Sequence, residues 1–142
     1  GGLTGWRGDL AIPVGEDQIL RCFAQEKGVK VQTLEGIFDL RERLYELEGK
    51  LDRHTFVRIS HSEIVNLKKV TALDLSLTGT IKMTLVGDVV CYVSRRYVKK
   101  IKDLDWLLKY GMSHRPKMIY KIYRIAGFGL TITALKMLDR IK

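Results

Sequence analysis

The sequence predicts a mainly β protein of antiparallel hairpins with short helices, followed by a C-terminal helical extension. Apolar and polar residues alternate with a period of two in segments such as Val29–Thr33, as expected for a strand with one buried face. Turns that contain glycine, such as Glu26–Gly28 and Gly87–Asp88, separate these segments. Apolar residues recur at helical spacing in only a few places, so helices are expected to be the minority.

In the first half of the chain we expect four strands and one helix. Residues 1–11 contain glycine and aspartate and few apolar residues, so we expect a loop there, followed by a short extended piece at Ile12–Val14. Four leucines at helical spacing predict an amphipathic helix that ends near Gly49; they are Leu40, Leu44, Leu47 and Leu51. The expected strands are 19–25, 29–33, 37–40 and 55–60.

The middle of the chain predicts further antiparallel strands joined by short turns. His61–Glu63 is expected to form a brief turn after the strand at 55–60. A strand-like stretch from Val65 to Leu77 is interrupted at residues 66–69, and Thr78–Gly79 is expected to turn the chain. The strands expected after this turn are 80–85 and 89–93.

The end of the chain predicts two helices and a second structural part. Ser94 is a good N-cap for a helix over residues 95–110, because its hydroxyl can accept a hydrogen bond from a free amide of the first turn. Residues 118–141 predict a helix with apolar residues almost all round it, which requires burial. The alternatives are packing on its own domain, pairing with a second chain, and docking on a membrane surface or a membrane-bound partner. We therefore expect a domain at 1–110 and a basic, apolar helical tail at 111–142.

The charge of the chain is strongly uneven. The formal net charge is +9. Residues 1–92 carry 12 Lys and Arg against 13 Asp and Glu, whereas residues 93–142 carry 13 against 3. A basic block of this kind indicates a polyanionic partner, either a nucleic acid or an anionic membrane surface. The alternative is a solvated basic helix without a partner.

The composition argues against several other classes of protein. Two cysteines, Cys22 and Cys91, lie in apolar strand-like runs, and we expect them to be buried free thiols in a reducing cytoplasm. The three histidines have no metal-ligand spacing, and no glycine-rich phosphate loop or nucleophile–base set is present. We therefore expect neither an enzyme nor a bound metal or cofactor.

Two arginines occupy the first turn of the predicted helix at residues 95–110. The N-terminus of a helix carries a partial positive charge, so Arg95 and Arg96 are locally unfavourable by about 0.3–1 kcal/mol each. A phosphate at this position would reverse the sign of the interaction. This pattern favours nucleic-acid binding; the alternative is that the arginines pair with nearby acids such as Glu63 or Asp88.

Several blocks of this sequence, in the right order, resemble the LytTR-type DNA-binding domain. They are Leu40–Glu48 (LRERLYELE), Phe56–Asn66 (FVRISHSEIVN) and Val93–Ile101 (VSRRYVKKI). The resemblance covers about residues 10–108. It implies an elongated β fold of about ten strands in antiparallel sheets, in which loops enter successive major grooves of DNA. It also implies bacterial transcription regulation at paired promoter sites, in a single-domain form without the receiver domain of response regulators.

The resemblance assigns roles to individual residues. His61 and Arg96 match base-contacting positions, and arginine can donate two hydrogen bonds to guanine. Asn66 matches a family asparagine that we interpret as structural, bonding loop backbone. Contacts to the DNA backbone are expected from the positions that match the family and from the basic residues beside them: Lys27, Lys30, Ser62, Tyr92, Ser94, Arg95, Lys99 and Lys100.

The expected partner is therefore double-stranded DNA with promoter direct repeats. The resemblance also allows a homodimer on DNA and a membrane-bound inhibitory partner. The alternative function is that of a peripheral membrane or adaptor protein that acts through the basic tail at 111–142.

Overall fold

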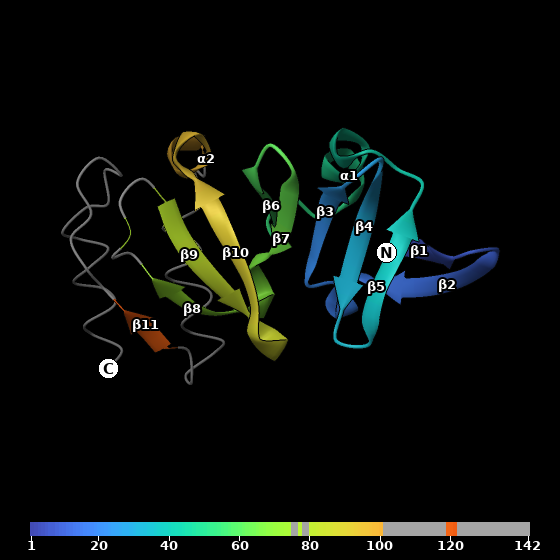
Figure 1. Cartoon of the computed structure of the whole chain (residues 1–142), viewed down its shortest axis with the longest axis horizontal. Coiled ribbons are helices and arrows are strands. Elements are labelled where there is room, and N and C mark those ends of the chain that lie inside the picture. Colours follow the sequence, from blue (N-terminus) through green and yellow to red (C-terminus); the bar gives the residue numbers. More distant parts are fainter. Residues whose placement is uncertain (75–76, 78–79, 101–118, 122–142) are drawn as a thin grey trace. The chain divides into compact units, whose positions relative to one another are not determined.

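The computed structural model describes residues 1–74, 77, 80–100 and 119–121, with only the backbone described at 98–100 and 119–121. By the density of its internal contacts the chain divides into two compact units, Gly1–Asn66 and Leu67–Lys142. Each unit contains its own sheet, which is antiparallel in the first unit and mixed in the second (Figure 1). The mainly β fold with short helices that the sequence predicts is confirmed.

The first unit is a seven-stranded antiparallel sheet with one short helix. The strand order is β2-β1-β5-β4-β3-β7-β6, so neighbours along the chain are mostly neighbours in the sheet. Its elements are β1 (Gly2–Arg7), β2 (Leu10–Gly15), η1 (Glu16–Gln18), β3 (Arg21–Gln25), β4 (Gly28–Thr33), β5 (Gly36–Leu40), α1 (Leu44–Lys50), β6 (Phe56–Ser60) and β7 (Glu63–Asn66).

The N-terminal hairpin corrects the loop that we expected at residues 1–11. β1 and β2 pair along their whole length, and β1 also pairs with β5 through Trp6 and Asp39. Glycine lowers the strand propensity of this segment, but sheet pairing overrides propensity. Gly5 serves the packing, because a Cβ at this position would lie 2.9 Å from Cβ of Phe38. Gly8 turns the hairpin with a φ of 60°, which other residues adopt only at a cost.

Helix α1 packs its leucines into the core of the first unit. Leu44, Leu47 and Leu51 are buried in one cluster with strand residues such as Cys22 and Ile64. The helix is shorter at its start than the leucine spacing predicts, because Leu40 pairs with Val29 as the last residue of β5. The leucine spacing therefore identified the buried face correctly but extended it one turn into a strand.

The second unit is a smaller sheet with the order β10-β9-β8-β11. Buried residues alternate with more exposed ones along β9 and β10, which form where the sequence predicts strands at 80–85 and 89–93. The elements of this unit are η2 (Leu67–Lys69), β8 (Val70–Asp74), β9 (Thr80–Leu85), η3 (Val86–Asp88), β10 (Val89–Ser94), α2 (Arg95–Lys100) and β11 (Ile119–Lys121).

The helix expected at 118–141 is wrong for three of its residues. Ile119–Lys121 form β11, which pairs in parallel with β8 from Ala72 to Asp74. An unpaired strand edge offers a row of backbone hydrogen-bonding groups, and sheet pairing there competes with helix formation. The expectations for residues 78–79, 101–118 and 122–141, including the boundary at residue 110, lie outside the described residues.

Both cysteines are buried free thiols, as predicted. Burial, together with the negative charge of Glu42, raises the pKa of the Cys22 thiol to about 12, so this side chain is a neutral core residue at physiological pH. Over the part of the chain that the structure describes, no helix is long and apolar enough to cross a membrane. Over the same residues, no three His, Cys, Asp or Glu side chains form a group able to hold a metal ion.

Candidate nucleic-acid interface

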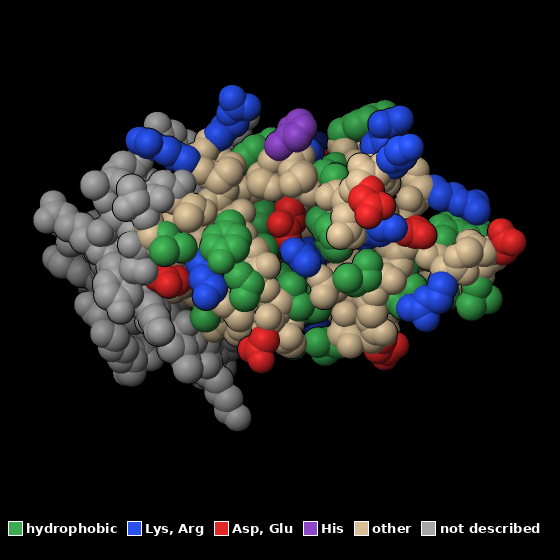
Figure 2. Space-filling view, viewed as in Figure 1, with side chains coloured by type: hydrophobic (Ala, Val, Ile, Leu, Met, Phe, Trp, Pro, Cys, Tyr) green, Lys and Arg blue, Asp and Glu red, His purple; other side chains and the backbone are tan. Residues whose placement is uncertain are grey.

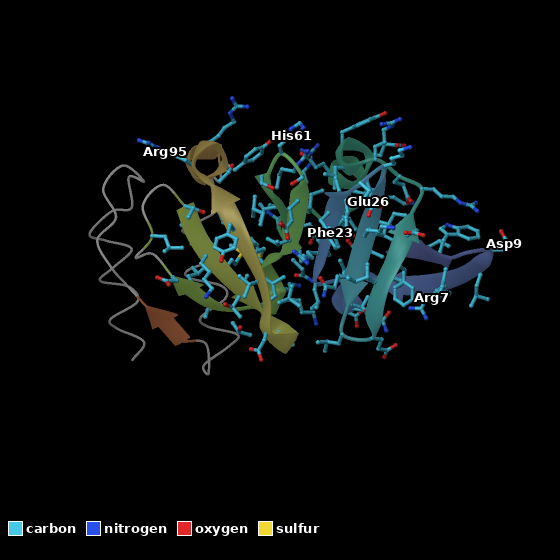
Figure 3. The ribbon with its side chains drawn as sticks, in the orientation of Figure 1. Arg7, Asp9, Phe23, Glu26, His61 and Arg95 are labelled. Atoms are coloured by element: carbon cyan, nitrogen blue, oxygen red, sulfur yellow. The ribbon has the colours of Figure 1, made fainter. Side chains whose placement is uncertain are left out.

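The β6–β7 loop presents His61 at its tip (Figure 3). Ser60 pairs with Glu63, which leaves His61 and Ser62 as a two-residue turn, and the register of the two strands shifts between Arg58 and Ser60. Such a bulge re-aims the side chains that follow it. The amide of Ser62 donates a hydrogen bond to Oγ of Ser60 at 3.2 Å. The turn is held by its own serines, and the His61 side chain is exposed.

Arg58 holds the same loop from one side. Its Nε donates to the carbonyl oxygen of Ser60 at 2.9 Å, and its Nη2 donates to the carbonyl oxygen of His61. Its Nη1 forms an ion pair with Glu48 of α1. One guanidinium group therefore joins the loop to the helix by three contacts, and the backbone that carries His61 is fixed relative to α1.

Glu63 anchors the other side of the loop to the sheet. Its Oε2 accepts a hydrogen bond from Nη1 of Arg21 at 2.8 Å, and Nε of Arg21 donates to Gln32 at 2.7 Å. Burial raises the pKa of Glu63 and outweighs the opposing effect of Arg21. The carboxylate that could have paired with Arg95 or Arg96 is thus engaged by an arginine of its own sheet.

The β3–β4 turn lies beside the β6–β7 loop. The amide of Ala24 donates to the carbonyl oxygen of Ser62 at 2.8 Å, which ties the two turns together. Lys27 is exposed at the tip of the β3–β4 turn, after Glu26 in a left-handed conformation with a φ of 56°. Lys30, two residues past the turn, instead forms an ion pair with Asp39 on β5.

These two turns and α1 surround a hollow of about 610 Å³, which we call the basic hollow. Within the first unit, Figure 2 shows Lys and Arg side chains (blue) gathered over α1. Three of the site residues predicted from the sequence line the basic hollow, namely Lys27, His61 and Ser62, whereas Lys30 does not. The residues that line the basic hollow are Ala24, Glu26, Lys27, Gly28, Val29, Leu40, Arg41, Glu42, Arg43, Leu44, Tyr45, Arg58, His61 and Ser62.

Sequence reasoning missed four residues of this hollow: Arg41, Arg43, Tyr45 and Arg58. The first three stand at the start of the helix that the leucine spacing predicts, within the block Leu40–Glu48. Two arginines flanking one glutamate between Leu40 and Leu44 were the available signal. Their position beside His61 depends on sheet pairing, which the local pattern does not contain.

The junction of β10 and α2 carries the second group of predicted residues. Tyr92 and Ser94 lie on the same face of β10, since they are two positions apart, and the Tyr92 side chain is 51 % exposed. Oγ1 of Thr80 donates to the carbonyl oxygen of Val93 at 2.7 Å and fixes the end of the strand. Arg95 then begins α2 (Figure 3).

Arg95 and Arg96 are both exposed. Neither forms an ion pair or hydrogen bond among the described residues, so the alternative pairing with Glu63 or Asp88 is not observed there. Within the part of the chain that the structure describes, no acidic side chain neutralises their charge. Lys99 and Lys100 belong to α2, and the structure describes only their backbone.

Asn66 has the structural role that the sequence suggested. Its Nδ2 donates to the carbonyl oxygen of Ile19 at 2.9 Å and to that of Glu16 at 3.4 Å. The side chain is 1 % exposed. The buried amide therefore ties the segment before β3 to the end of β7, and it presents no group to a ligand.

Curated relatives of the chain occur in Staphylococcus aureus. Uncharacterized HTH-type transcriptional regulators of strains NCTC 8325 / PS 47 and COL are each 47 % identical to this chain over 77 residues. That alignment covers 54 % of this chain and 52 % of each relative, so the chain spans about half the length of the curated relatives that it matches.

A solved structure and a family model agree with the fold. The LytTr DNA-binding domain of a methyl-accepting/DNA response regulator from Bacillus cereus superposes with a TM-score of 0.69 at 24 % identity. The superposition covers 73 % of this chain and 96 % of that domain. Residues 11–105 match the model of the LytTr DNA-binding domain, including the β6–β7 loop and the β10–α2 junction. The chain belongs to the LytTr DNA-binding domain family.

Proposed function

We propose that this chain is the DNA-binding part of a bacterial transcription regulator that recognises specific double-stranded sequences. The observation that carries the proposal is the match of residues 11–105 to a DNA-binding family, in a chain that exposes polar loops at the positions predicted for base contact. The Staphylococcus relatives are named as transcriptional regulators, and we extend that role to this chain. This role is non-enzymatic and places the protein in the cytoplasm.

DNA recognition in this proposal uses loops in the major groove. The two described helices, α1 and α2, are separated by strands β6 to β10, so these helices do not form a helix–turn–helix pair. His61 at the β6–β7 turn and Arg96 at the β10–α2 junction contact base edges. The exposed side chains of Lys27, Ser62 and Arg95 contact phosphates and set the register without discriminating between bases.

The remaining backbone contacts of the proposal come from Lys30, Tyr92, Ser94, Lys99 and Lys100. Among these, Lys30 must exchange its ion pair with Asp39 for a phosphate. The target is a pair of direct repeats in a promoter, bound by two copies of the chain. A membrane-bound inhibitory partner rests on the family resemblance and stays a prediction. A membrane-directed role of the tail at 111–142 rests on its basic, apolar sequence and stays a prediction too.

The test is fluorescence anisotropy with a duplex selected from a promoter library and a scrambled duplex, at two salt concentrations. Wild-type protein should prefer the selected duplex, and Arg96→Ala should lose about 1–3 kcal/mol of that preference, because a bidentate contact to guanine disappears. Arg53→Ala, an exposed arginine outside the basic hollow and the β10–α2 junction, is the control and should bind as wild type does.

Two outcomes would contradict the proposal. Equal, salt-sensitive binding to both duplexes would leave only a basic surface without sequence recognition. Binding to anionic lipid vesicles with no preference between duplexes would favour the peripheral membrane function instead.

A further inference from the structure

The side chains that line the basic hollow of the first unit carry an excess of positive charge. Four of its lining residues are cationic, Lys27, Arg41, Arg43 and Arg58, whereas only two are acidic, Glu26 and Glu42. Glu42 is engaged by Lys50, whose Nζ lies 2.8 Å from its Oε2. Although burial opposes it, the hydrogen bond and charge of Lys50 hold the pKa of Glu42 below its usual value. That carboxylate therefore does not neutralise the arginines beside it.

The cations of the hollow differ in how they are held. Arg58 forms an ion pair with Glu48 and donates a hydrogen bond to the β6–β7 loop. Lys27 and Arg43 are exposed, and neither forms an ion pair among the described residues. Two full positive charges are thus open to a ligand at the edge of the hollow.

Arg41 is held without being neutralised. Its guanidinium carbon lies 3.4 Å from the centroid of the Trp6 ring on β1. Stacking on an aromatic face fixes the plane of a guanidinium group but leaves its outward N–H donors free for an oxyanion. The N-terminal hairpin, most of which precedes the family match, thereby positions a donor at the hollow.

The chemistry of the hollow suits a phosphate group. Guanidinium groups donate two parallel hydrogen bonds to phosphate oxygens, and a tyrosine hydroxyl adds a neutral donor. The side chain of Tyr45 is 70 % exposed and lines the same hollow. His61 also lines it, so a phosphate bound there lies next to the turn that carries the base-reading side chain.

We propose that the basic hollow binds a phosphate of the DNA backbone, and that Arg41, Arg43 and Tyr45 are its contacts in addition to Lys27. This inference rests on the proposed function, because the phosphate belongs to the duplex whose bases His61 reads. The hollow sets the register of the β6–β7 loop on the duplex and contributes affinity without sequence preference.

The test is the salt dependence of DNA binding for Arg43→Ala, with Arg53→Ala as the matched control. Arg43→Ala should weaken binding to the selected and the scrambled duplex alike, by roughly tenfold at low salt. It should also reduce the slope of log K against log salt by about 0.9, because one phosphate contact is lost. Arg43→Lys should restore most of the slope. Tyr45→Phe should weaken binding but leave the slope unchanged, because a hydroxyl carries no charge.

Three results would overturn the inference. The first is a slope for Arg43→Ala equal to that of Arg53→Ala. The second is a loss of sequence preference in Arg43→Ala with the slope unchanged, which would make Arg43 a base contact. The third is unfolding of both Arg43→Ala and Arg43→Lys, judged by circular dichroism, which would make the residue structural.

A titration with inorganic phosphate separates this inference from the proposed function. In wild-type protein, phosphate should shift the amide NMR signals of Lys27, Arg43 and Tyr45 more than chloride at equal ionic strength does, and Arg43→Ala should lose the effect. If the protein has no duplex preference but these shifts persist, the proposed function fails and DNA is the wrong source of the phosphate. If the protein prefers the selected duplex but the shifts are absent, only the hollow is wrongly assigned.

Discussion

At the scale of the residue, Arg58 holds the turn that carries His61, the residue that we propose contacts a base. It donates hydrogen bonds to two successive carbonyl oxygens of the His61 turn and pairs with Glu48. Together these contacts hold one backbone conformation of a two-residue turn. The direction in which His61 points is therefore set by an arginine that lies three positions before it.

We predict that Arg58→Lys lowers the preference for the selected duplex by acting through His61. Lysine keeps a positive charge but cannot donate the same fork of hydrogen bonds. In a double-mutant cycle, Arg58→Lys should cost preference in the wild-type background and little more in the His61→Ala background, with a coupling energy of about 0.5–3 kcal/mol.

The measurement is anisotropy with the selected and scrambled duplexes for the four proteins of the cycle. Arg53→Lys, made in both backgrounds, is the control and should show no coupling. An equal loss of preference in both backgrounds would mean that Arg58 acts independently of His61.

At the scale of the element, the presence of the strands was easier to predict than the residues at which helix α1 and strand β5 begin or end. The strands β4, β9 and β10 were predicted correctly, because short apolar runs between turn signals are local properties of the sequence. The ends of α1 and β5 depend on Leu40, which pairs with Val29 on the preceding strand β4 and so ends β5 instead of beginning the helix. Asn66 is a similar case, since its amide bonds Ile19 and Glu16.

We predict that Asn66→Ala lowers the free energy of unfolding by about 1–3 kcal/mol, because it leaves a buried carbonyl oxygen of Ile19 without this donor. Urea unfolding followed by circular dichroism would measure the change. Gln25→Ala, at an exposed position of β3, is the control and should change stability by less than about 0.5 kcal/mol. If Asn66→Ala lowers the free energy of unfolding by as little as the control does, water replaces the amide at no cost.

At the scale of the whole molecule, the two residues that we propose as base contacts belong to different compact units. His61 belongs to the unit Gly1–Asn66, and Arg96 belongs to the unit Leu67–Lys142. The family match spans the boundary between them, so the functional domain is larger than either unit. The net charge of the second unit is the greater one, because most of the basic excess lies in residues 93–142.

We predict that the effects of His61→Ala and Arg96→Ala on DNA binding add within about 0.5 kcal/mol, since the two side chains belong to separate units with separate hydrogen-bonded supports. Anisotropy titrations of the two single variants and the double variant on the selected duplex would measure this. If the double variant binds the selected duplex as tightly as the weaker-binding single variant does, the contacts are not independent and the two loops act as one unit.

The sequence by itself determined the mainly β class, most of the strands, the buried face of α1 and the family. It did so because residue alternation and the quoted motifs are local properties of the chain. It also identified the polar turn at His61 and the exposed arginines at the start of α2.

Only the tertiary structure decided which residues share a surface. The N-terminal hairpin forms because β1 finds a partner in β5, and β11 forms because β8 has an edge to pair with. Arg41, Arg43 and Tyr45 line a hollow with His61 because sheet pairing brings together segments that are distant in the sequence. Propensity and periodicity contain no information about such pairings, since their free energy comes from hydrogen bonds and burial between strands.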